Sequence, residues 1–155
     1  MTKKEFRDRI KKSKLILDGA TGSNLQKRGM PVGVCPEEWI IENSEVLKQL
    51  QIEYIQAGSD VLYAPTFSGN RIKLEEYGLD DKLSEINTKL VEISKAAVDE
   101  GLTDEEKKAG REVYIAGDIT MTGKQVYPVM KQDTTFDISR EKIGKRKNDK
   151  SQDGY

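Results

Sequence analysis

The fold is decided near the start of the chain by the stretch Leu15-Ile16-Leu17-Asp18-Gly19-Ala20-Thr21-Gly22. A short apolar run stops there at an acid, and glycines follow it closely. An apolar run of this length between turn residues is typical of a buried strand. In α/β folds, the loops at the carboxyl ends of parallel strands build the binding site. We therefore expect Asp18 to stand where a strand opens into a site-forming loop.

Two later stretches repeat this design. Residues 60–64 lead into Pro65-Thr66-Phe67-Ser68-Gly69-Asn70, and residues 113–116 lead into Gly117-Asp118-Ile119-Thr120. Apolar residues at helical spacing predict helices over residues 44–57 and from Asp80 or Asp81 to about Asp99, between the predicted strands. Strands that alternate with helices indicate an α/β fold with a parallel sheet and right-handed crossovers. The sequence thus predicts three βα units whose strands deliver polar residues to one rim.

Composition narrows the function classes. The 155 residues carry a formal net charge of −1, which gives no electrostatic case for a nucleic-acid or membrane partner. No apolar run approaches the roughly 20 residues that span a bilayer, and no secretory signal is seen, so we expect a cytoplasmic protein. The chain has no histidine and a single cysteine, Cys35, which we interpret as a half-buried structural residue. Any metal site would need mainly oxygen ligands.

The remaining segments set the expected domain organisation. A short amphipathic helix is predicted over residues 3–12, and a long loop with one helical turn over residues 19–36. Residues 1–130 form the predicted structured domain. Residues 131–155 carry few apolar residues and are expected to be a charged, flexible tail.

Each candidate site residue has a structural and a functional interpretation. Asp18 is either a turn acid or a carboxylate that binds a substrate ammonium group, and Asp118 has the same two interpretations. Thr66 and Asn70 either stabilise their loop or contact a ligand. The run from Gly117 to Lys124 resembles a phosphate-binding loop, but it has one residue too many between its glycines and Gln125 in place of Ser or Thr. A small nucleotide-binding protein is therefore a weaker alternative.

Taken together, the three rim stretches and their flanking residues, over roughly residues 13–129, resemble the homocysteine S-methyltransferase family. That family includes the homocysteine-binding module at the N-terminus of cobalamin-dependent methionine synthase. The resemblance implies a (β/α)₈ TIM barrel and methyl transfer to the sulfur of homocysteine, giving methionine. By the same resemblance, Asp18, Gly19 and Thr66 match positions that bind the substrate. The methyl donor is not encoded in these segments.

The resemblance also implies what is missing. A zinc ion held by three cysteine thiolates activates the sulfur in this family, and no residues here match those ligands or a second substrate-binding acid. Three βα units are too few for a closed barrel. We therefore expect a truncated, partial barrel that is inactive alone, with no catalytic or metal-binding residues of its own. The alternative is a non-catalytic half-barrel that assembles with a separately encoded zinc-binding half, or with corrinoid or folate modules.

Overall fold

The structure is a computed structural model, and it describes residues 2–119 and 122. The predicted domain boundary at residue 130 and the predicted tail over residues 131–155 lie outside the described residues. Half of the stretch from Gly117 to Lys124 that resembles a phosphate-binding loop, residues 120, 121, 123 and 124, also lies outside them.

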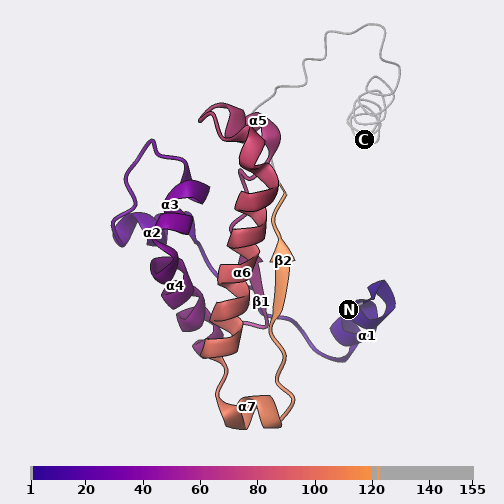
Figure 1. Cartoon of the computed structure of the whole chain (residues 1–155). Coiled ribbons are helices and arrows are strands. Elements are labelled where there is room, and N and C mark those ends of the chain that lie inside the picture. Colours follow the sequence, from indigo (N-terminus) through magenta and orange to yellow (C-terminus); the bar gives the residue numbers. More distant parts are fainter. Residues whose placement is uncertain (1, 120–121, 123–155) are drawn as a thin grey trace, which may run out of the picture. The chain divides into compact units, whose positions relative to one another are not determined.

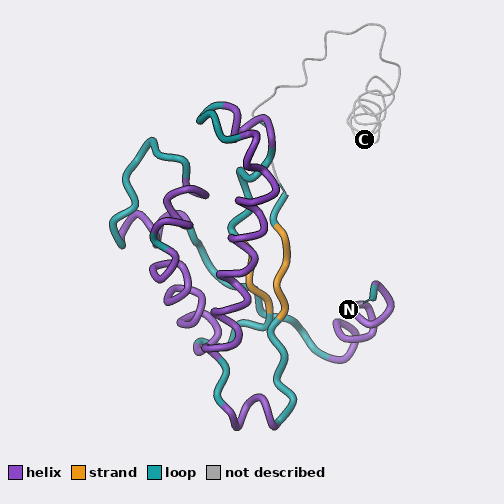
Figure 2. The backbone as a smooth tube through the Cα atoms, in the orientation of Figure 1, coloured by secondary structure: helices purple, strands orange, loops and turns teal. Residues whose placement is uncertain are grey.

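Helices dominate the described residues, and two short strands lie among them (Figures 1 and 2). In chain order the elements are α1 (Lys3–Lys12), α2 (Gly22–Lys27), α3 (Pro36–Glu42), α4 (Ser44–Gln56), β1 (Val61–Ala64), α5 (Arg71–Glu75), the 3-10 turn η1 (Asp80–Lys82), α6 (Leu83–Gly101), α7 (Asp104–Lys108) and β2 (Tyr114–Gly117).

The two strands are parallel, and β1 pairs with β2 from Val61 opposite Tyr114 to Ala64 opposite Gly117. The prediction of a strand over residues 15–17 is wrong, because only Leu17 among them forms a bridge, which is parallel and pairs it with Val61. Ile16 and Leu17 are 58% and 50% exposed, so the apolar run is not a buried strand. It nevertheless runs beside β1, since the Val61 amide donates to the Ile16 carbonyl at 3.1 Å. Where three βα units were predicted, the described part of the chain forms two strands and one bridge.

The two long helices match the predicted spacing. In α4, Leu47, Leu50 and Ile55 are buried, and in α6 the buried positions include Ile86 and Leu90. The two helices pack against each other, and α6 also contacts both strands. Gly58 follows α4 with φ of +102°, the left-handed conformation that ends a helix and that glycine adopts without strain.

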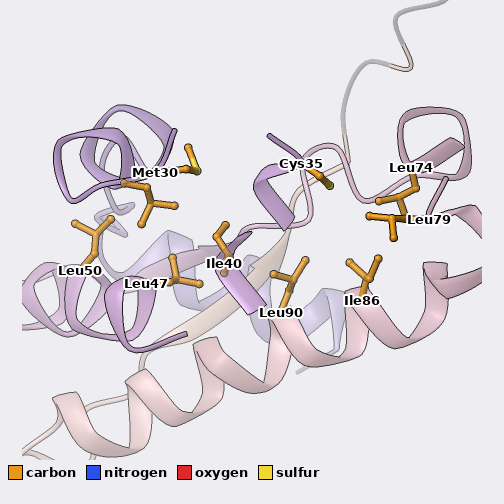
Figure 3. Packing of buried hydrophobic residues seen from close by; sticks show 10 residues of the cluster. Met30, Cys35, Ile40, Leu47, Leu50, Leu74, Leu79, Ile86 and Leu90 are labelled. Carbon is orange, nitrogen blue, oxygen red and sulfur yellow. The ribbon is translucent and has the colours of Figure 1, made fainter. Parts of the chain in front are cut away.

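The core lies between these helices. Figure 3 shows side chains from α3, α4 and α6 pointing toward one another, with Met30 and Cys35 beside them. Helix α3 was not predicted: the expected loop ends at residue 36, and the next expected helix begins at residue 44. Its Ile40 is only 2% exposed, so α3 joins the core and brings the loop that follows α2 against α6.

Helix α1 forms where predicted and carries a capping box between Thr2 and Glu5. None of its residues is buried, and Phe6 and Ile10 stay 42% and 46% exposed. Within the part of the chain that the structure describes, none of the helices combines the length and the apolar character needed to cross a membrane.

Candidate functional site

The three predicted rim segments lie together at one edge of the sheet. The Leu17–Val61 bridge and the β1–β2 register run in the same direction, so Asp18, Pro65 and Asp118 all follow from the carboxyl ends of neighbouring segments. The parallel arrangement thus places one polar loop from each segment at the same end, as the sequence predicted.

Asp18 binds the end of β1 with one carboxylate oxygen and leaves the other without a partner. Its backbone amide donates to the Val61 carbonyl at 2.9 Å, and its Oδ2 accepts the Tyr63 amide at 3.0 Å. Its Oδ1 is buried and accepts no hydrogen bond from the described residues. Burial raises the pKa of Asp18, the amides of Tyr63 and Asp18 oppose that rise, and the charge of Asp118 adds to it. An unpaired buried acceptor of this kind suits a ligand that donates hydrogen bonds.

Gly19 sits against the ring of Tyr54. A Cβ at Gly19 would lie 2.9 Å from both Cε1 and the hydroxyl oxygen of Tyr54, which is closer than real Cβ contacts allow. The Tyr54 hydroxyl donates to the Ala20 carbonyl at 2.9 Å and accepts from Nδ2 of Asn24 at 3.0 Å. Glycine at this position therefore lets the loop after Asp18 pack closely onto α4.

Thr66 joins the loop after β1 to the loop after β2. Its hydroxyl donates to the Asp118 carbonyl at 2.8 Å and accepts the Asp118 amide at 3.0 Å. A hydroxyl has one hydrogen to donate, so any further contact of Thr66 with a ligand would use its remaining acceptor capacity. The loop-stabilising interpretation of Thr66 thus has direct structural support.

A pocket of about 480 Å³ opens beside these loops. Its lining is mainly apolar and includes two carboxylates, Glu37 and Asp118, and the described residues contribute no lysine or arginine to it. The apolar and aromatic part of the wall comes from Leu25, Met30, Pro36, Ile40, Tyr63, Pro65 and Phe67. Gly19 belongs to the pocket wall, and Asp18 and Thr66 are joined to that wall by their hydrogen bonds to Tyr63 and Asp118, which both line the pocket.

Sequence reasoning missed Glu37, which is 2% exposed and lines the pocket. Its Oε1 accepts the Ser68 amide at 2.9 Å, and its Oε2 accepts the Cys35 thiol at 3.6 Å. Pro36 followed by acids is a signal for the first turn of a helix, and it could have located α3. Nothing in the sequence indicates that this acid, unlike Glu38, is buried.

The donors of this chain do not fit the zinc site that the resemblance implies. Three thiolates are needed, and the sequence contains one cysteine and no histidine. Over residues 2–119 and 122, no three Cys, Asp or Glu side chains form a group that could hold a metal ion. Cys35 is itself buried, and burial raises the pKa of its thiol. The thiol donates a hydrogen bond to Oε2 of Glu37.

Comparison with known proteins adds an independent line of argument. The sequence profile of a family described as homocysteine S-methyltransferase matches residues 15–149. Betaine–homocysteine S-methyltransferase 1 of Bos taurus is 32% identical over 105 residues, which are 64% of this chain and 26% of that protein. The S-methylmethionine–homocysteine S-methyltransferase of Pongo abelii is 26% identical over 101 residues, with the same shares covered. The chain thus spans about a quarter of the length of these relatives.

Among solved structures, the metallated form of the homocysteine methyltransferase MmuM from Escherichia coli is similar, with a TM-score of 0.63. The match has 24% sequence identity and covers 74% of this chain and 40% of that chain. At this identity the likeness shows the fold alone. It means that the helices and the parallel strands follow part of the fold of that enzyme.

Proposed function

Because the chain belongs to the homocysteine S-methyltransferase family, we propose that the pocket beside its three loops binds the amino-acid end of homocysteine for methyl transfer to the sulfur. In the family reaction the bond between the methyl carbon and its donor breaks, a carbon–sulfur bond forms, and the thiol loses its proton. The part proposed for this chain is binding and orientation of the substrate, which precede that step.

The single observation that supports the proposal most is the buried Oδ1 of Asp18, which has no hydrogen-bond partner among the described residues. A substrate ammonium group supplies the hydrogen bonds and the positive charge that this oxygen lacks, and a charge-assisted hydrogen bond is stronger than a neutral one. The Tyr63 amide fixes the carboxylate by its other oxygen. Gly19 then provides backbone at the pocket wall, and Thr66 holds the neighbouring loop through Asp118.

Binding and turnover are separate parts of the proposal. The chain is a methyltransferase by family, but no step is assigned to zinc because the cysteine and histidine content does not fit a three-thiolate site. On this basis the isolated chain binds homocysteine without methylating it. A separately encoded half that carries the thiolates, and the identity of the methyl donor, stay predictions from the sequence.

The proposal is tested by two measurements on the same preparation. Calorimetric titration with L-homocysteine is expected to give saturable binding to the whole chain. A methyl-transfer assay with zinc and each of betaine, S-methylmethionine and methylated folate is expected to give no methionine above the protein-free control. Robust turnover by this chain alone would refute the assignment of a binding role without catalysis, and absence of binding by the folded chain would refute the proposed site.

A further inference from the structure

The buried acid of the pocket differs from its neighbour in the sequence. Glu37 is 2% exposed, while Glu38 beside it in the first turn of α3 is exposed. A buried carboxylate is costly unless hydrogen bonds replace its water. Glu37 has such partners on both oxygens, the Ser68 amide at 2.9 Å and the Cys35 thiol at 3.6 Å. Its burial is thus tied to specific contacts rather than to general packing.

The contact with Ser68 joins α3 to the loop after β1. Ser68 lies 31 residues beyond Glu37, next to Phe67, and both Phe67 and Ser68 line the pocket. The far end of the same loop is fixed by Asn87 of α6, whose Nδ2 donates to the Gly69 carbonyl at 2.7 Å. Thr66 fixes the near end through Asp118. The Glu37 contact therefore holds the middle of the loop, between two other attachments.

Glu37 acts through this loop and not by charge pairing inside the pocket. Within residues 2–119 and 122, no lysine or arginine lines the pocket to pair with it, and each of its oxygens already has a partner within the protein. Without the carboxylate, the Ser68 amide would lose its acceptor, and an amide left unpaired at a part-buried site is unfavourable. The loop segment from Pro65 to Ser68 would then lose the attachment that sets its position on the pocket wall.

We propose that Glu37 is a positioning residue for the substrate pocket: its buried carboxylate fixes the Ser68 amide and so holds the loop after β1 in its binding geometry. This inference rests on the proposed function, in which the pocket binds homocysteine, but the hydrogen bond between Glu37 and Ser68 can be tested without any ligand. It assigns a role to an acid that the family resemblance did not single out in this sequence.

The test compares Glu37→Met, Glu37→Gln and the exposed-site controls Glu38→Met and Glu38→Gln in the full chain. Methionine keeps the length of the side chain without an acceptor, whereas glutamine keeps an oxygen for the Ser68 amide. Amide hydrogen exchange at Ser68 is the main measurement, and the Lys73 amide, bonded to the Asn70 side chain at 3.1 Å, is the internal reference. Calorimetric titration with L-homocysteine is the second.

The expected result is specific to the hydrogen bond. Glu37→Met speeds exchange at Ser68 by about tenfold or more and weakens homocysteine binding by a similar factor, while exchange at Lys73 is unchanged. Glu37→Gln restores both properties to within about threefold of the wild type, and both Glu38 variants match the wild type.

Three results would overturn the inference: fast exchange at Ser68 in the wild type, a Glu37→Gln variant as defective as Glu37→Met, or faster exchange at Ser68 with unchanged homocysteine affinity. If Glu37→Met does not fold, the wild-type exchange rate and Glu37→Gln still decide the matter. If the wild type itself does not bind homocysteine, the proposed function fails, and exchange at Ser68 still shows whether Glu37 holds the loop.

Discussion

Replacing Thr66 by valine tests whether the two rim loops are joined as described. Valine keeps the shape of the side chain and removes the hydroxyl, so the bonds of 2.8 Å and 3.0 Å to the Asp118 backbone are both lost. A typical intramolecular hydrogen bond contributes about 0.5–1.5 kcal/mol, so the two together predict a loss of about 1–3 kcal/mol in the free energy of unfolding. The third contact of the hydroxyl, at 3.5 Å to the Ala64 carbonyl, is too long to add to this sum.

Urea unfolding followed by circular dichroism measures the loss, and amide exchange at Asp118 locates it. Thr66→Ser is the matched control, since serine keeps the hydroxyl and is expected to retain most of the stability. The reasoning is refuted if Thr66→Val unfolds within about 0.5 kcal/mol of the wild type and the Asp118 amide exchanges no faster.

Three further variants test other parts of the structure. Asp18→Asn should be more stable than the wild type at pH 7, because burial raises the pKa of Asp18 and so disfavours its charged form in the folded protein. The stability that the raised pKa gives the wild type is present below the unfolded value of about 3.9 and is lost as pH rises through the folded pKa. The difference in urea midpoint between the two proteins should therefore shrink toward acidic pH, and a difference that grows there would refute this reasoning. Gly19→Ala should lower the melting temperature, because the added Cβ would displace the Tyr54 hydroxyl from its hydrogen bond to the Ala20 carbonyl. Gly22→Ala is the control and should not lower it, since a Cβ there meets nothing within 4 Å. Equal melting temperatures of the two variants would contradict this. Leu90→Ala, at a fully buried position of α6, should cost about 2–5 kcal/mol by urea unfolding, and a cost under about 1 kcal/mol would mean that the core is not packed there.

The long helices were predictable because their signal is local. In α6 the apolar residues alternate spacings of three and four, and Ile86 and Leu90 are buried as that spacing requires. Strand β2 also lies within one residue of its predicted position, at Tyr114–Gly117. Periodicity and turn residues in the sequence are enough to place such elements.

The prediction of the first strand was wrong because an apolar run in the sequence does not show which elements pack over it and bury it. Ile16 accepts a hydrogen bond from Val61 of β1 and Leu17 forms a bridge with it, yet both side chains stay half exposed. Helix α3 was missed because its seven residues are too few for a clear period, although Pro36 marks its first turn.

The site was only partly predictable for a related reason. The meeting of the loops at Asp18, Thr66 and Asp118 follows from parallel strands, which the sequence indicates. The burial of Glu37 depends on the Ser68 amide 31 residues away, and no local pattern carries such a contact. The family resemblance named Asp18, Gly19 and Thr66, and their roles toward substrate stay predictions.

The central claim, that Asp18 binds the ammonium group of homocysteine, is tested most directly by comparing two ligands on two proteins. Titrations with L-homocysteine and with 4-mercaptobutanoate, which lacks the ammonium group, are recorded by NMR for the wild type and for Asp18→Asn. A hydrogen bond to a charged group is worth about 1.5–3 kcal/mol, so the wild type should prefer homocysteine by about 10- to 150-fold and the variant should lose that preference. Equal affinity of the wild type for both ligands, or an undiminished preference in Asp18→Asn, would contradict the account.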